Sequence, residues 1–263
     1  MSSADESRRL AEIYDRVSDF QLAGGKRLLE RLGLEEGARV LDVGCGTGRL
    51  ARWIAERVGP TGSVVGIDPL EDWISVARSH ASAVQFEVGR AEDLAFDDAS
   101  FDLVCLSSVL HWVPDKARAL AEIRRVLRPG GRVGLTTLPQ ELSHAGTIAL
   151  VLKPLLQRPP YAEHIDRSGA RRACTSTELV SLVLESRLEL VELHITPTVS
   201  RHESGEDFVA FAEASAGGSL LAMVPEPLRA SLRAELVAAF EAQRGPDGVV
   251  VRGWEVLVVA ART

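Results

Sequence analysis

Hydrophobic and polar positions follow two alternating periods between residues 38 and 137. Short apolar, often β-branched runs predict strands, and between them apolar positions recur every three or four residues, which predicts amphipathic helices. The expected strands are residues 39–43, 63–67, 84–88, 101–106 and 131–137, and the expected helices are residues 48–58, 70–80 and 115–127. Alternation of this kind is typical of βαβ units, so it predicts a parallel sheet covered by helices on both faces.

The flanking segments follow other patterns. Residues 5–32 predict helix, and residues 140–172, which include three prolines, predict an irregular or helical insertion. Further helices are expected at residues 176–187, 205–216 and 227–244, and further strands at residues 188–200 and 248–261. We therefore expect a doubly wound α/β fold of seven strands.

The same pattern predicts a division of the chain into three segments. Residues 1–37 are expected to form an N-terminal helical cap segment, and residues 38–139 the core. Residues 140–263 are expected to complete the sheet and to carry an inserted helical substrate cap.

Composition narrows the class of protein. The net charge of −7 argues against nucleic acid or an anionic membrane as the main partner. Cys45, Cys105 and Cys174 are odd in number and lack metal-ligand spacing, which favours a reducing compartment. The N-terminus is too charged for a signal peptide, and no apolar stretch reaches the roughly 18 residues of a membrane span. We expect a cytoplasmic protein, as monomer or homodimer.

The stretch "VLDVGCGTG" at residues 40–48 places glycines at positions 44, 46 and 48. A dinucleotide fingerprint would need its third glycine at position 49, where the chain has Arg49, and the loop lacks the lysine of a P-loop. Three glycines this close predict a sharp turn or a ligand lying against bare backbone. The spacing therefore argues against both NAD and a nucleoside triphosphate.

Two carboxylates flank this loop at the ends of expected strands. Asp68 ends the second strand, where it could accept hydrogen bonds from the hydroxyls of a ribose. Asp42 ends the first strand, and its charge would repel a pyrophosphate but suit an ammonium or sulfonium group. Either residue could instead be a turn former or helix cap.

Five motifs in order carry a family resemblance: "VLDVGCGTG", "GIDP" (66–69), "GRAEDLAF" (89–96), "FDLVCLSSVLHWVPD" (101–115) and "VLRPGGRV" (126–133). Together they resemble class I S-adenosylmethionine (SAM)-dependent methyltransferases, in the small-molecule group of the ubiquinone/menaquinone C-methyltransferases and trans-aconitate methyltransferase. The resemblance covers residues 38–137 and the closing strand. It implies a seventh strand antiparallel to the fifth, and SAM as cofactor.

The resemblance also implies the residues around the cofactor. They are Asp42 near the methionyl amino group, Gly44, Cys45 and Gly46 in the loop, Asp68 on the ribose, Pro69 and Leu70 beside the adenine, Arg90, Ala91 and Glu92 at the adenine edge, Ser107 behind the cofactor, and Tyr14 shielding it. Arg90 departs from the family pattern, in which Asp or Asn is commoner. Because a guanidinium cannot accept a hydrogen bond from the adenine amino group, Glu92 or the backbone is expected to do so.

Catalysis makes modest demands on side chains, because a sulfonium is already a good leaving group. If the acceptor must lose a proton, His111 and His144, which follow the fourth and fifth strands, are the candidate bases. Cys45 and Cys105 are more simply packing residues than nucleophiles. No histidine pair has zinc-ligand spacing, so no metal is expected.

The expected function is methyl transfer to a small acceptor. The cap segments are apolar, with Phe208, Phe211, Leu220, Leu221 and Met223, although most of these must pack the cap itself. The acceptor is therefore expected to be partly apolar, with no preference among oxygen, nitrogen, carbon or sulfur. Two alternatives stay open: a non-catalytic SAM-binding or regulatory protein, and an NAD-dependent oxidoreductase.

Overall fold

The structure is a computed structural model that describes residues 3–80, 83–165, 173–216 and 219–263. The chain forms two compact units. The larger unit comprises Asp19–Gln140, Arg172–Ile195 and Glu255–Thr263. The smaller unit comprises Met1–Ser18, Glu141–Arg171 and Thr196–Trp254. The three-segment division expected from the sequence stays a prediction.

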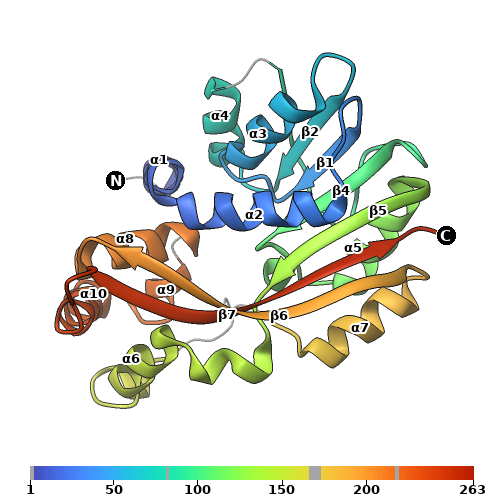
Figure 1. Cartoon of the computed structure of the whole chain (residues 1–263). Coiled ribbons are helices and arrows are strands. Elements are labelled where there is room, and N and C mark those ends of the chain that lie inside the picture. Colours follow the sequence, from blue (N-terminus) through green and yellow to red (C-terminus); the bar gives the residue numbers. More distant parts are fainter. Residues whose placement is uncertain (1–2, 81–82, 166–172, 217–218) are drawn as a thin grey trace. The chain divides into compact units, whose positions relative to one another are not determined.

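One seven-stranded sheet runs in the order β3-β2-β1-β4-β5-β7-β6 (Figure 1). Its strands are β1 (Arg39–Val43), β2 (Ser63–Asp68), β3 (Gln85–Val88), β4 (Phe101–Ser107), β5 (Leu127–Thr137), β6 (Glu189–His202) and β7 (Val249–Ala261). β1 to β5 pair in parallel, whereas β7 runs antiparallel to β5, with Arg132 opposite Ala261. The predicted fold, including the antiparallel closing strand, is confirmed.

The central strands are buried on both faces, as their continuous apolar runs predict. Val40 belongs to an apolar cluster with α2 (Asp19–Leu32), α3 (Arg49–Val58) and α4 (Glu71–His80). Its neighbour Leu41 belongs to a second cluster with α5 (Lys116–Val126) and α7 (Ser176–Glu185). Successive side chains of a strand point to opposite faces, so the helices form two layers around the sheet (Figure 1).

Several element ends differ from the predictions. The N-terminal helical stretch divides at the buried Ser18 into α1 (Ser3–Val17) and α2. β5 begins at Leu127 rather than at residue 131, and Gly130 adopts a φ of +77° in the irregular turn that follows. α7 ends at Glu185 rather than at residue 187, and Thr175 caps its start in a capping box with Glu178.

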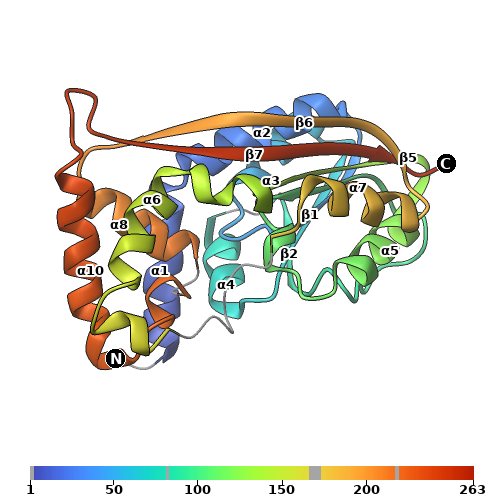
Figure 2. The ribbon, with the colours of Figure 1, turned by 90° about the horizontal axis from the view of Figure 1, so that it is seen from below.

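Helices dominate the smaller unit. Besides α1 it contains α6 (Thr147–Leu156), η3 (Tyr161–Glu163), α8 (Gly205–Ser215), α9 (Ser219–Ala222) and α10 (Glu226–Glu241), and η2 (Gln140–Ala145) leads into it. α8 and α10 lie side by side (Figure 2), and Phe208, Phe240 and Tyr161 are buried in one apolar cluster. The short helix α9 was not predicted, and residues 166–172 of the predicted insertion lie outside the described residues. That this unit covers the sheet edge as a substrate cap stays a prediction.

None of the helices in the described ranges combines the length and the apolar character needed to cross a membrane.

Candidate active site

The glycine loop after β1 is a left-handed turn held against β2. Gly44, Gly46 and Gly48 have φ angles of +72°, +58° and +78°, which residues with a Cβ rarely adopt. The backbone N–H groups of Gly44 and Cys45 both donate to the Ile67 carbonyl, at 2.7 and 2.9 Å. The loop therefore turns sharply at the carboxyl end of the sheet, where open α/β folds bind ligands.

Close packing also excludes side chains at two of these glycines. A Cβ on Gly44 would lie 2.4 Å from Val109 Cγ2, and one on Gly48 would lie 2.4 Å from Phe86 Cζ. Gly48 thus allows the start of α3 to pack against β3, while Gly44 allows the segment after β4 to cross the loop. Val109 is a site residue that the sequence motifs did not single out, because it is 65 positions from Gly44.

Asp68, at the end of β2, holds the loop through its carboxylate. Its Oδ2 accepts the Gly46 N–H at 3.1 Å, and its Oδ1 accepts the Leu70 N–H at 3.0 Å. Burial raises the pKa of Asp68, and these two N–H groups oppose that rise. A carboxylate has about four lone-pair sites, so both oxygens keep acceptor capacity for the hydroxyls of a ribose.

Asp42, at the end of β1, is a buried carboxylate that is only half satisfied. Its Oδ1 lies 3.4 Å from the Cys105 thiol, whereas its Oδ2 has no hydrogen-bond partner among the described residues. Burial raises the pKa of Asp42 to about 7, and the charge of Asp68 adds to the rise. Because an unpaired buried charge is costly, this arrangement favours a cationic ligand group beside Oδ2.

Two further buried oxygens lack partners among the described residues, Thr47 Oγ1 and Gln21 Oε1. Thr47 lies in the glycine loop. Gln21 lies in the first turn of α2, which an ion pair between Asp19 and Arg49 (2.6 Å) holds against the start of α3. Sequence reasoning missed Gln21, since nothing local marks a glutamine on an amphipathic helix as buried without a partner.

The segment after β3 begins beside Asp68. The Gly89 N–H donates to the Asp68 carbonyl at 3.1 Å, and Arg90 and Asp93 then close a short turn. Ala91 in this turn is buried, while the Glu92 carboxylate lies 3.9 Å from the Arg90 guanidinium. The structure thus brings these sequence-predicted residues to the same sheet edge as Asp68. Pro69 and Leu70 follow Asp68 directly and are exposed.

The segment after β4 lies beside the end of β5. Ser107 pairs with Thr136, and Ser108 is strained, with a φ of +61°. In η1 (Leu110–Trp112), His111 is buried, and its Nδ1 lies 3.1 Å from Thr137 Oγ1. One ring nitrogen of this candidate base is therefore occupied by a protein partner.

Two sequence-predicted residues lie in the other unit. Tyr14 is in α1 and His144 is in η2, so their proposed roles beside the cofactor stay predictions. Burial raises the pKa of Cys45 and of Cys105 well above the ordinary value, so both are neutral thiols rather than nucleophilic thiolates. The described part of the chain contains no group of three or more His, Cys, Asp or Glu side chains arranged to hold a metal ion.

The site can be tested against the groups of SAM. The unpaired Asp42 oxygen fits an ammonium or sulfonium, and the free acceptor capacity of Asp68 fits ribose hydroxyls. Bare backbone at Gly46 fits a ligand lying across the loop. The donor and acceptor set is therefore compatible with this cofactor.

Comparison with known proteins finds similarity over the same region. Residues 41–135 match the methyltransferase domain family. The chain is 37% identical over 140 residues to the chloroplastic 2-phytyl-1,4-beta-naphthoquinone methyltransferase of Arabidopsis thaliana, covering 48% of this chain and 54% of the relative. It is also 37% identical over 134 residues to the demethylmenaquinone methyltransferase of Staphylococcus aureus (strain JH9), covering 48% and 56%. The chain thus spans about half the length of these curated relatives.

A candidate methyltransferase from Bacillus halodurans has the same fold, with a TM-score of 0.61 and 22% identity over 91% of this chain and 99% of that one. The domain match and the two relatives, together with this shared fold, confirm that the core resembles class I SAM-dependent methyltransferases of the menaquinone group.

Proposed function

We propose that this chain, whose core resembles class I methyltransferases, transfers the methyl group of SAM to a small, partly apolar metabolite. When bound, SAM supplies an activated methyl group on a sulfonium. The observation that carries the proposal is Asp42, which adjoins a glycine loop of left-handed turns and whose buried Oδ2 has no partner within the described ranges. A binding site for NAD would not place a buried carboxylate where a pyrophosphate lies.

Each residue of the site has a binding role in this proposal. Asp42 orients the methionyl end through charge, and Asp68 accepts the ribose hydroxyls while keeping the Gly46 N–H in place. Residues 90–92 and Leu70 border the adenine. The remaining cofactor contacts that we propose are those of Gly44, Cys45, Pro69, Ser107 and Tyr14.

The protein's contribution to the rate is positioning and exclusion of water. Fixing a nucleophile in line with a methyl group can lower the barrier by about 7–11 kcal/mol in favourable intramolecular cases. A base is needed only for an acceptor that must lose a proton, and then contributes about 10²–10⁴-fold. His144 is our first candidate and His111 the second, because Thr137 already holds one ring nitrogen of His111.

The acceptor that we propose is a cyclic, apolar compound of the naphthoquinone class on which the two relatives are named as acting. The apolar side chains of the smaller unit support this choice, although most of them pack its own core. Three buried free cysteines support a cytoplasmic location.

The proposal is tested by incubating the chain with SAM that carries an isotopically labelled methyl group. The acceptors are reduced naphthoquinones with and without an alkyl chain, together with a metabolite extract, and the readout is mass spectrometry. We expect a labelled product that disappears in Asp42→Asn. Bound SAM with no labelled product from any acceptor would favour the non-catalytic alternative.

A further inference from the structure

The segment between β3 and β4, residues 89–100, has little regular structure of its own. Within the segment, Arg90 and Asp93 close a turn, the Phe96 N–H donates to the Leu94 carbonyl at 2.8 Å, and Ser100 Oγ donates to the Asp97 carbonyl at 2.6 Å. Other buried main-chain groups of the segment need partners outside it. Two of its side chains, Ala91 and Leu94, are buried in the apolar cluster that includes α5. The segment begins at Gly89, whose N–H donates to the Asp68 carbonyl, so its position sets what lies beside Asp68.

Helix α5 supplies the missing partners from one face. Arg118 Nε donates to the Glu92 carbonyl at 2.7 Å, and Glu122 Oε2 accepts the Leu94 N–H at 3.0 Å. Arg118, Glu122 and Arg125 are spaced by four and three residues, so they share one face of the helix.

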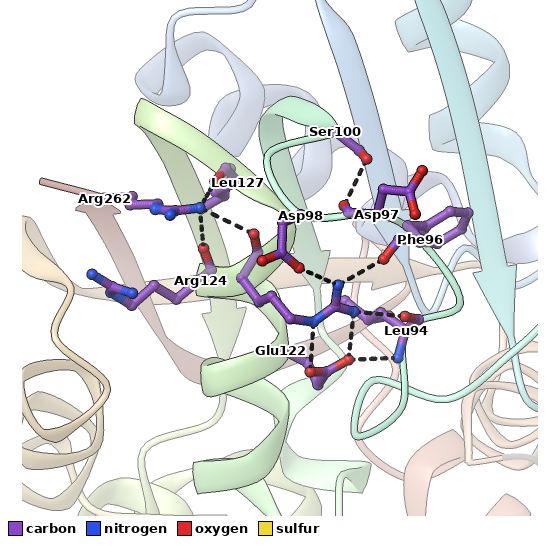
Figure 3. Close-up of polar contacts among 10 residues, drawn as sticks. Leu94, Phe96, Asp97, Asp98, Ser100, Glu122, Arg124, Leu127 and Arg262 are labelled. Carbon is purple, nitrogen blue, oxygen red and sulfur yellow. Dashed lines mark hydrogen bonds and ion pairs between the residues drawn. The ribbon is translucent and has the colours of Figure 1, made fainter.

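Arg125 makes the most extensive of these contacts. It donates to both oxygens of Glu122 at 2.9 and 2.8 Å, to the carbonyls of Leu94 (2.8 Å) and Phe96 (2.7 Å), and to Asp98 Oδ1 at 2.9 Å. In Figure 3, Glu122, Leu94, Phe96 and Asp98 converge on one guanidinium group. These five bonds use all five N–H donors of the guanidinium. A lysine, with three donors on a single nitrogen, cannot reproduce the arrangement.

The helix also holds the far end of the segment. The Ala99 N–H donates to the Arg125 carbonyl at 3.0 Å, and Ala99 has a φ of +57°. The hydrogen bond to Arg125 lowers the pKa of Glu122, so the pair stays ionised near neutral pH. Main-chain groups at residues 92, 94, 96 and 99 are therefore all fixed by α5.

We propose that Arg118, Glu122 and Arg125 are positioning residues that hold residues 90–98 in the geometry with which the chain recognises the adenine of its cofactor. This inference rests on the proposed function. None of the three side chains needs to touch the cofactor. They act by fixing the main chain around Ala91 and Glu92, and binding groups must be held within about 0.5 Å of their productive geometry.

The test compares two ligands, S-adenosylhomocysteine and S-inosylhomocysteine, in which hypoxanthine replaces adenine. Titration calorimetry gives the Kd of each for the wild type, Arg125→Gln, Arg125→Lys and Arg118→Gln. The matched control is Arg124→Gln, because Arg124 lies on the same helix but donates to the Arg187 carbonyl. The ratio of the Kd for S-inosylhomocysteine to the Kd for S-adenosylhomocysteine reports recognition of the base. A general loss of stability would not change this ratio selectively.

We expect Arg125→Gln to raise the Kd for S-adenosylhomocysteine by about tenfold or more and to bring the ratio towards one, because hydrogen bonds of a charged group are lost. Arg125→Lys should resemble Arg125→Gln in both the Kd and the ratio. Arg118→Gln should also raise the Kd for S-adenosylhomocysteine and bring the ratio towards one, each by a smaller factor than Arg125→Gln. Arg124→Gln should match the wild type.

Three outcomes overturn the inference: a wild-type ratio near one, an unchanged ratio in both Arg125→Gln and Arg118→Gln, or an equal loss of recognition in Arg124→Gln. If Arg125→Gln fails to fold, Arg118→Gln decides the question, since it removes a single bond from an exposed side chain. A wild type that binds neither ligand would instead contradict the proposed function.

Discussion

Replacing Asp42 by Asn should stabilise the unliganded protein while weakening its binding of SAM. The substitution keeps the shape of the side chain but removes a charge that is buried and only half satisfied. Asp42 has a pKa of about 7 in the folded chain, against an ordinary value of 3.8. At about 1.36 kcal/mol per pH unit, this difference corresponds to roughly 4 kcal/mol of lost stability at high pH.

The sign of the pH dependence follows from the two protonation states. The unfolded chain ionises Asp42 near pH 4, whereas the folded chain keeps it protonated up to about pH 7. The unfolded state therefore binds fewer protons in this window, and stability falls as pH rises from about 4 to about 7. Asp42→Asn should remove this fall, so the variant should gain most over the wild type above pH 7.

The assay is urea unfolding of wild type and variant at several pH values between about 3 and 8.5. Asp102→Asn provides a control of opposite sign. Although burial acts to raise the pKa of Asp102, hydrogen bonds from Arg39 and the charges of Arg39 and Arg128 lower it. This control should lose stability at neutral pH, and the loss should shrink as the pH falls into the acid range.

Affinity should move in the opposite direction to stability. A cationic ligand group prefers ionised Asp42, so wild-type SAM affinity should increase as pH rises through about 7. Asp42→Asn should bind more weakly and without this dependence. An Asn variant with the wild-type pH slope of stability, or with undiminished SAM affinity, would refute the reasoning.

Three further predictions concern other parts of the molecule. Gly44→Ala should destabilise the chain by about 1–3 kcal/mol in urea unfolding, because of the positive φ at residue 44 and the clash with Val109. Val109→Ala in the same chain should recover part of this loss. If the effects of the two substitutions on stability simply add, there is no clash. For an acceptor that must lose a proton, His144→Ala should lower the single-turnover rate by about 10²-fold or more, while His111→Ala should mainly lower stability. If the rate falls by less than about threefold in both variants, positioning alone is the mechanism. Phe208→Ala should lower the free energy of unfolding by about 3–5 kcal/mol, because the Phe208 ring is buried and its centroid lies 4.3 Å from that of Phe240. A loss below about 1 kcal/mol in urea unfolding would contradict the described packing.

The sheet was predictable because its strands are short apolar runs that require burial on both faces. Val40 and Leu41 illustrate the rule, since adjacent residues enter opposite apolar clusters. Element ends were less predictable. No glycine or proline marks the break at Ser18. The turn after Leu127 contains glycines but lies within β5, and its Gly130 N–H donates to the Arg262 carbonyl at 2.7 Å.

The candidate site was predictable where its chemistry is local in sequence. Asp42 and Asp68 lie at the ends of their strands and the three glycines follow β1, so spacing alone brings them to one edge of the sheet. The contacts that hold this edge join distant positions, as Val109 does to Gly44 and Arg125 to Leu94. No local pattern specifies such contacts, because they depend on the register between elements.

The most direct test of the central claim is a calorimetric titration of the chain with SAM, repeated with NAD and with Asp68→Ala. The account predicts one-to-one binding of SAM, no heat with NAD, and an affinity about tenfold or more lower in Asp68→Ala, because charged hydrogen bonds contribute roughly 1.5–3 kcal/mol. Binding of NAD in place of SAM, or unchanged SAM affinity in Asp68→Ala, would contradict it.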